Sequence, residues 1–118
     1  MLTRFNQNDR TSQFARKLAS DLATTNPTVL YEVPSGMSAR IVSMWLASNH
    51  NNNVAVRVFH TRGSEAAGTT NALLYDVTAS ANTTVVYDAP IFMAPGDRIW
   101  VRVATASTVC ITLYGEEQ

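Results

Sequence analysis

Cysteine and histidine are scarce in this sequence, and their scarcity excludes two ways of holding a chain together. The single cysteine, Cys110, has no partner for an intrachain disulfide, so the covalent framework of small secreted domains is excluded. The two histidines, His50 and His60, form neither an HxH nor an HExxH pair. We therefore expect no metal site, and the 118 residues must form one domain that is stabilised by a hydrophobic core.

Long apolar runs and an excess of one charge are also absent. No segment approaches the roughly 20 apolar residues of a membrane span, and the N-terminus lacks the apolar region of a signal peptide. Nine basic residues balance nine acidic residues, so the chain has no overall electrostatic preference for nucleic acid or anionic lipid. We expect a soluble protein that is made in the cytoplasm and binds neither nucleic acid nor membrane.

Catalytic motifs are missing as well. The sequence contains no GxSxG, no glycine-rich phosphate loop and no acidic calcium loop. Asp76, Asp88 and Asp97 each lie beside a turn or a strand end, where aspartate commonly caps backbone amides. Cys110 has no neighbouring base that would activate it as a nucleophile. We expect a protein that is not an enzyme and uses no cofactor.

The charges are distributed unevenly along the chain. Residues 1–17 contain four basic residues and one acidic residue, whereas the remainder contains five arginines and eight acidic residues. A chain end is ordered only where a surface holds it, because ordering costs backbone entropy. We predict that residues 1–17 form an extended arm, which either docks to its own body or a neighbouring copy or stays solvated. Residues 18–118 are predicted to form the folded domain.

Short β-strand signals dominate the rest of the sequence. Residues 30–48 and 90–104 each read as a strand, a Pro/Gly turn and a longer strand, and Pro95–Gly96 fits the central positions of a type II turn. Residues 54–60 alternate between apolar and polar side chains. Residues 98–104 and 109–114 are predicted to pair as a hairpin with a four-residue loop.

The strand over residues 39–49 differs from the others, because it is apolar on both faces. Simple alternation places Ile41 beside Trp45 on one face and Val42 beside Met44 on the other. Strands of this kind are covered on both sides. With about eight short strands and no convincing helix, the chain is predicted to be all-β, an antiparallel jelly-roll-like β-sandwich with an extended N-terminal arm.

Several large side chains fall on the polar faces of these strands. Trp100 lies between Arg98 and Arg102, and Phe59 lies beside Arg57. Tryptophan, phenylalanine and arginine are enriched in protein interfaces. Three interpretations remain open: these side chains cover the outside of their own sheet, they form an oligomer or assembly interface, or Trp100 stacks on a small ligand such as a sugar.

Three stretches resemble small β-sandwich virion proteins of tailed bacteriophages. Residues 30–41 read LYEVPSGMSARI, which is similar to the family's LYTVPAGKTARI turn, and residues 94–101 read APGDRIWV, as in its later turn. Residues 111–115 resemble the family's terminal strand. Glu32 and Met37 depart from the commoner threonine and lysine. The resemblance covers roughly residues 28–115, so the basic arm lies outside it.

The resemblance implies a structural protein of the virion, most simply a capsid cement or decoration protein that binds the head lattice as a homotrimer. Its partners would be copies of itself and the major capsid protein, and it would occupy the capsid surface after assembly in the host cytoplasm. The alternative is a tail component: an adaptor, a fibre or a receptor- or glycan-binding module. The candidate interface residues are Arg4, Phe5, Arg10, Phe14, Arg16, Arg57, Phe59, Arg98, Trp100 and Arg102.

Overall fold

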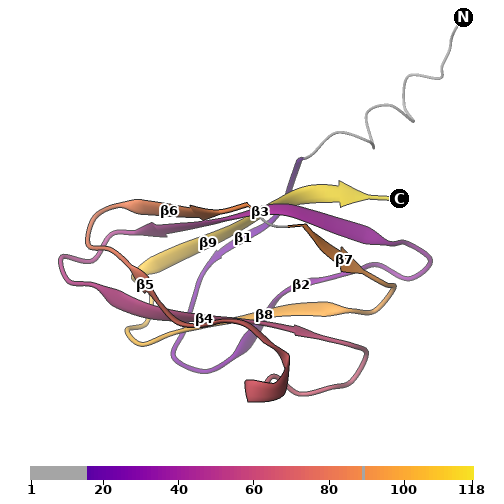
Figure 1. Ribbon diagram of the computed structural model, residues 1–118, viewed down its shortest axis with the longest axis horizontal. Coiled ribbons are helices and arrows are strands. Elements are labelled where there is room, and N and C mark those ends of the chain that lie inside the picture. Colours follow the sequence, from indigo (N-terminus) through magenta and orange to yellow (C-terminus); the bar gives the residue numbers. More distant parts are fainter. Residues whose placement is uncertain (1–15, 89) are drawn as a thin grey trace, which may run out of the picture.

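The computed structural model describes residues 16–88 and 90–118, which form two antiparallel sheets packed face to face (Figure 1). Sheet A has the order β1 (Arg16–Leu22), β9 (Val109–Glu117), β3 (Ala39–Ser48) and β6 (Thr84–Tyr87), with β7 (Ile91–Met93) also paired to β3. Sheet B has the order β2 (Thr28–Glu32), β8 (Arg98–Val103), β4 (Val54–Thr61) and β5 (Ala72–Ala79). A short 3₁₀ helix, η1 (Thr69–Asn71), precedes β5. The predicted all-β sandwich is confirmed.

The strands pair in a nested order. β1 pairs with β9, β2 with β8, β3 with β6, and β4 with β5, as if one long hairpin had been rolled up. This nesting is the strand order of a jelly roll, with β7 as an additional short strand. Among the residues that the structure describes, no helix has the length and apolar composition needed to cross a membrane.

The space between the sheets is filled by one continuous apolar core. Its largest fully buried side chains come from the central strands of both sheets, for example Ile41 and Leu46 of β3 and Ile99 of β8. The predicted alternation of β4 is confirmed on the core side, where Val54, Val56 and Val58 are buried. Burying each such side chain contributes roughly 1.5–3 kcal/mol.

Both Pro/Gly turns are type II turns, as predicted for Pro95–Gly96. Gly96 has a φ of 85°, and the amide of Asp97 donates to the carbonyl of Ala94 at 3.0 Å. Gly36 has a φ of 79° in the equivalent position of the first turn. The two turns lie side by side, because the carbonyl of Val33 accepts from the amide of Gly96 at 3.1 Å.

The predicted hairpin over residues 98–104 and 109–114 is wrong. β8 belongs to sheet B and β9 to sheet A, so the connection between them crosses from one sheet to the other. The same holds for the strands on either side of the two Pro/Gly turns. Turn residues determine that the chain reverses, but the nested pairing determines which sheet each strand joins.

The predicted assignment of the β3 side chains to the two faces of the strand is also wrong, because a β-bulge interrupts the strand. The register with β9 shifts between Ile41 and Ser43, which turns Ile41 to the core together with Met44. Val42 then falls on the outer face with Trp45, which is 42% exposed. Within the described part of the chain, only the core-facing side of β3 is therefore covered.

The boundary of the predicted arm also moves. Arg16 and Lys17 pair with Gly115 and Tyr114 at the start of β1, so these two residues belong to sheet A. Residues 1–15 lie outside the described part of the chain.

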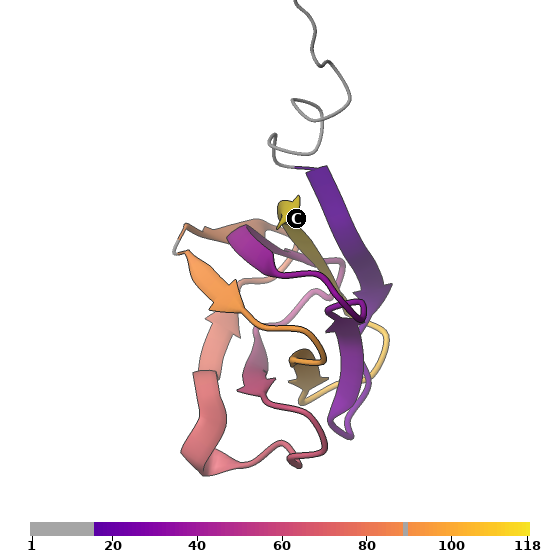
Figure 2. The same ribbon diagram turned by 90° about the vertical axis from the view of Figure 1, so that its right-hand side faces the viewer.

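The two sides of the sandwich differ in their edge strands. At one side β1 and β2 contact each other across the two sheets (Figure 2). At the opposite side the terminal strands are β5 of sheet B and β6 with β7 of sheet A. We call this opposite side the open side, because β5 makes no comparable contact with β6 or β7 there; core-facing side chains are partly buried at both sides.

Candidate assembly surfaces

The outer face of sheet B carries most of the predicted interface residues. The register between β4 and β8 places these side chains opposite one another in three rows: Arg57 with Arg102, Phe59 with Trp100, and Thr61 with Arg98. The structure therefore brings Arg57, Phe59, Arg98, Trp100 and Arg102 together on one face; alternation placed them on the polar faces of their strands, and the pairing of β4 with β8 joins the two sets.

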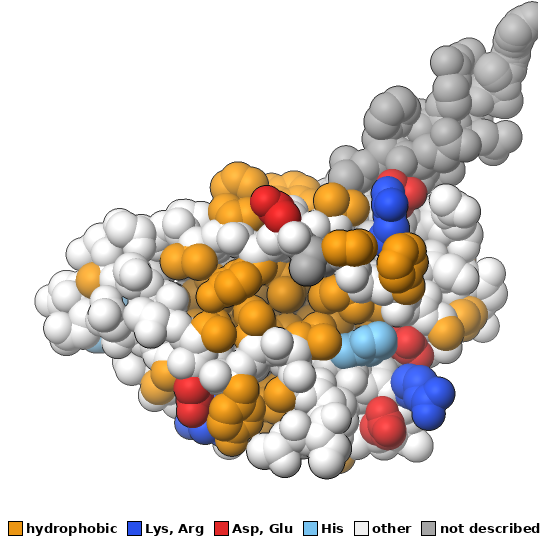
Figure 3. All heavy atoms as spheres, in the orientation of Figure 1, with side chains coloured by type: hydrophobic (Ala, Val, Ile, Leu, Met, Phe, Trp, Pro, Cys, Tyr) orange, Lys and Arg blue, Asp and Glu red, His pale blue; other side chains and the backbone are white. Residues whose placement is uncertain are grey.

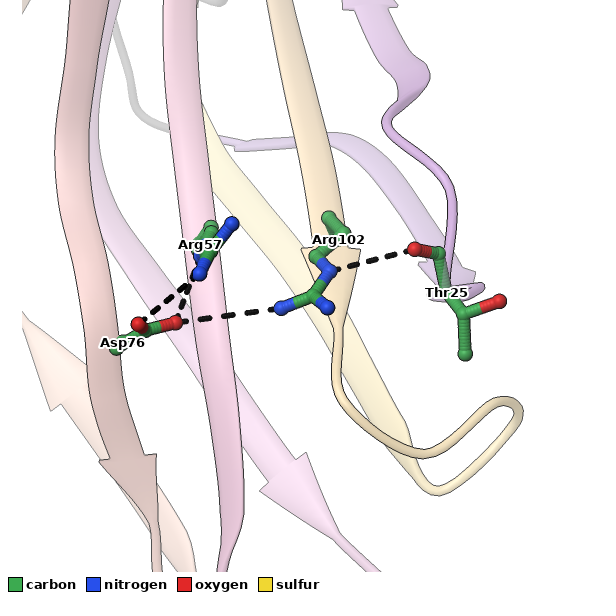
Figure 4. Close-up of polar contacts among 4 residues, drawn as sticks. All are labelled: Thr25, Arg57, Asp76 and Arg102. Carbon is green, nitrogen blue, oxygen red and sulfur yellow. Dashed lines mark hydrogen bonds and ion pairs between the residues drawn. The ribbon is translucent and has the colours of Figure 1, made fainter. Parts of the chain in front are cut away.

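The two arginines in the first row share an aspartate of the next strand (Figure 4). Nε and Nη2 of Arg57 donate to the two carboxylate oxygens of Asp76 at 2.7 and 3.0 Å, and this pairing lowers the pKa of Asp76. Arg102 Nη1 lies 4.0 Å from Asp76, and its Nε donates to the carbonyl of Thr25 at 3.3 Å. The Arg57 guanidinium also stacks 4.1 Å from the ring centre of Tyr75. Both arginines thus have partners within their own chain.

The two rings of the middle row are less accessible than predicted. Phe59 is only 3% exposed although it lies outside the core cluster, so the expectation of an exposed phenylalanine is wrong. Trp100, directly opposite, is half-buried, and its Nε1 donates to Thr61 Oγ1 at 2.8 Å. These contacts favour the interpretation in which the rings cover the outside of their own sheet.

The remaining predicted arginines form ion pairs at strand ends. Arg98 Nε lies 3.1 Å from Glu32 Oε1, and Arg16 Nη2 lies 2.7 Å from Glu117 Oε1. Exposed pairs of this kind contribute about 0–1 kcal/mol each. The other four candidates, Arg4, Phe5, Arg10 and Phe14, lie outside the described residues.

The outer face of sheet A carries an aromatic pair that the sequence analysis did not propose as a site. Trp45 of β3 and Tyr114 of β9 meet edge to face, with ring centres 6.0 Å apart and planes at 69°. Trp45 Nε1 donates to Ser43 Oγ at 3.1 Å, and Val86 of β6 lies beside Trp45 in the register. Because Trp45 was assigned to a doubly covered strand, its exposure was missed.

The open side holds a gathering of apolar side chains at the surface (Figure 3). Five of them point toward the core but are only partly buried: Leu74, Val77, Val85, Tyr87 and Ile91. Four more on the same edge strands are exposed: Leu73, Tyr75, Val86 and Phe92. In Figure 3 the hydrophobic side chains run along the middle of this face, between the two sheets. We call these nine residues the open-side patch.

The patch carries little signal in the sequence. Large side chains at polar positions of a strand stand out there, whereas most of the patch consists of ordinary core-facing residues. Their exposure arises because β5, β6 and β7 are the last strands of their sheets. A signal was available in Phe92, a large apolar residue in a very short strand, which is 70% exposed.

The buried polar groups near the second turn serve the fold. Asp97 is buried, and its Oδ2 accepts from the amide of Ala94 at 3.1 Å and lies 2.9 Å from His60 Nε2. This carboxylate therefore closes its own turn, as predicted for aspartates in such places. Within residues 16–88 and 90–118, no group of three or more His, Cys, Asp or Glu side chains is arranged to hold a metal ion.

A shallow hollow of about 380 Å³ lies at the end of sheet A, next to the open side. Its walls include Phe92 and the ion pair of Arg40 Nη2 with Glu116 Oε2, at 2.7 Å. The hollow combines an exposed ring with charged hydrogen-bonding groups, a combination that suits a small polar ligand better than a large apolar one.

No protein-family model matches this chain, and no curated protein is significantly similar to it in sequence. The resemblance to phage virion proteins therefore rests on the two turn motifs and the terminal strand.

Proposed function

We propose that this chain is a non-enzymatic structural protein of a bacteriophage particle, a capsid cement or decoration protein that stabilises the head lattice as a homotrimer. The observation that carries the proposal is the open-side patch, an apolar surface along the edge strands β5, β6 and β7. Large exposed apolar patches mark surfaces that bind other macromolecules. The turn motifs at residues 30–41 and 94–101 supply the link to virion proteins.

The proposed mechanism is mechanical. A rigid jelly roll presents its apolar surfaces to sister subunits, while residues 1–15, which contain Arg4 and Arg10, reach neighbouring copies of the major capsid protein. An oligomer that contacts several capsid subunits at once gains avidity through effective concentration, even when each contact is weak. Such a protein would lie on the capsid surface after assembly in the host cytoplasm.

A tail component is the second candidate, as an adaptor, a fibre or a receptor- or glycan-binding module. The exposed ring of Trp45 favours the glycan-binding form, because sugars stack on accessible aromatic faces. Trp45 replaces Trp100 in this role, since Trp100 is half-buried and bonded to Thr61. Shielding of Trp45 from a soluble quencher in the assembled particle would argue against glycan binding.

Gold-conjugated antibody against this protein on intact phage particles tests the proposal by electron microscopy. We expect label over the whole head, at the many equivalent positions that a cement protein occupies. Label confined to the tail or to one vertex would contradict the cement function and support a tail component. Antibody that has been adsorbed with the purified protein is the control for specific labelling.

A further inference from the structure

We propose that the open-side patch is the surface through which this chain binds a second copy of itself. The inference deepens the proposed homo-oligomer, on which it rests, by naming the contact surface. That surface lies along β5, β6 and β7 and borders the arginine-bearing outer face of sheet B, where Arg57 stacks on Tyr75.

The patch lies where both sheets end. β5 ends sheet B and β6 and β7 end sheet A, so at this side neither sheet has a further strand to cover its core-facing side chains. Leu74, Val77 and Val85 pack against the core and are still accessible from outside. A second copy placed here would complete the burial that the single chain leaves unfinished.

The patch is sizeable, although it is spread over the gap between the sheets and the outer flanks of the edge strands, where Val86 lies beside Trp45 and Tyr75 beside Arg57. With about 150–250 Å² for a fully exposed aromatic side chain and less for an aliphatic one, the nine residues together expose on the order of 500 Å² of apolar surface. A standard interface buries about 800 Å² on each partner, and homodimer interfaces are about 65% apolar. The patch is therefore large enough to be the apolar centre of an interface between copies of this chain.

Charged residues are few in the edge strands of the patch. β6 and β7 contain no charged residue, and the only charged residue in β5 is Asp76, which is bonded to Arg57. Exposed edges are commonly protected by lysine or proline; these strands have no lysine, and the exposed Asp88 and Pro90 lie between β6 and β7. A surface with so few charges gives little electrostatic recognition of a charged partner, but it suits the apolar contact between identical chains.

The backbone at Asp76 indicates how the copies meet. This residue has a φ of 56°, and the register of β5 with β4 is irregular there. An interrupted strand is a poor template for a continuous ladder of backbone hydrogen bonds. The contact is therefore made by side chains, and substitutions at exposed side chains should disrupt it.

Sedimentation velocity of the full-length chain over a wide range of concentrations tests the inference. The open-side variants are Leu73→Lys and Phe92→Lys, which alter exposed side chains and should leave the fold intact. The matched control is Leu22→Lys in β1, at the opposite side of the sandwich, because Leu22 is 45% exposed and Leu73 is 41% exposed. Circular dichroism and thermal melting verify that each variant is folded.

We expect the unaltered chain to self-associate, each open-side variant to weaken association at least tenfold, and Leu22→Lys to leave it unchanged. A chain that is monomeric at all concentrations would overturn the inference, including the case in which its own residues 1–15 cover the patch. Association that is lost in Leu22→Lys but kept in both open-side variants would also overturn it, by placing the contact at the β1 edge.

Hydrogen exchange on the same full-length samples locates the contact. Protection of residues 72–79, 84–87 and 91–93 that increases with concentration supports the inference, whereas protection restricted to residues 1–15 overturns it. If the chain is monomeric and the gold-conjugated antibody still labels phage heads, only this inference is overturned. An oligomer that is absent from particles would instead contradict the proposed function.

Discussion

Gly115 is the residue whose identity the fold constrains most sharply. An added Cβ at this position in β9 would lie 2.2 Å from the carbonyl oxygen of Arg40 and 3.0 Å from the Cα of Ile41. These are backbone atoms of β3 beside the bulge, so they cannot move aside as a flexible side chain would. The close approach of β3 and β9 therefore requires glycine.

Gly115→Ala should lower the free energy of unfolding by about 1–3 kcal/mol, because the backbone must shift to admit the methyl group. The matched control is Gly68→Ala, where an added Cβ meets nothing within 4 Å and the backbone is extended. That substitution should change stability by less than about 0.5 kcal/mol. Urea unfolding of both variants measures the difference, and equal stabilities would contradict the proposed crowding.

At the scale of elements, one polar link joins three strands across the two sheets. Tyr31 of β2 donates its hydroxyl hydrogen to Glu117 of β9, and Arg16 of β1 donates to the other carboxylate oxygen of Glu117 at 2.7 Å. Tyr31 is nearly buried. Burial, followed by the hydrogen bond to Glu117, raises the pKa of the Tyr31 phenol well above its usual range. The link therefore favours the protonated tyrosine.

This raised pKa predicts how stability changes in alkali. Because the folded state holds the Tyr31 proton more tightly than the unfolded state, its contribution is complete below the usual tyrosine pKa of about 10 and is lost as the pH rises toward the folded-state pKa. Tyr31→Phe should reduce the loss of stability above about pH 10. Urea unfolding of both proteins between pH 8 and 11 measures this slope, and an identical slope in the variant would contradict the link.

At the scale of the whole molecule, we expect residues 1–15 to be needed for attachment and the sandwich to fold without them. A variant that begins at Arg16 keeps all of β1 and its pair with Glu117. We expect this variant to fold with an unchanged melting temperature and, on the proposed cement function, to lose binding to phage heads that lack the protein. A deletion of residues 1–17 would also remove Arg16 and Lys17 from β1, so that a loss of binding could not be separated from a loss of stability.

Cosedimentation with such heads measures the binding. Undiminished binding by the shortened variant would show that residues 1–15 have no part in attachment. A chain in which Arg4 and Arg10 are both replaced by glutamine provides the control, since it keeps the length of the segment and changes only its charge. Loss of binding in that variant as well would assign attachment to the two arginines.

The strands and turns of this protein could be predicted because their causes are local. Alternating valines placed Val54, Val56 and Val58 on the core face of β4, and the need for a positive φ at Gly96 specified a type II turn. The facing of β3 could not be predicted in the same way. Its bulge between Ile41 and Ser43 is set by the register with β9, which is distant in the sequence.

The candidate interface residues likewise could be predicted only as far as their local pattern reaches. Alternation correctly placed Phe59 and Trp100 on the outer faces of their strands, but it could not show that the two rings lie opposite each other, that Phe59 is buried or that Trp100 is bonded to Thr61. The sequence by itself determined the all-β class, the strands and the turns, because propensity and periodicity act within a few residues. Only the tertiary structure decided which strands end each sheet, and therefore which apolar side chains remain at the surface, because the nested pairing joins residues far apart in the chain.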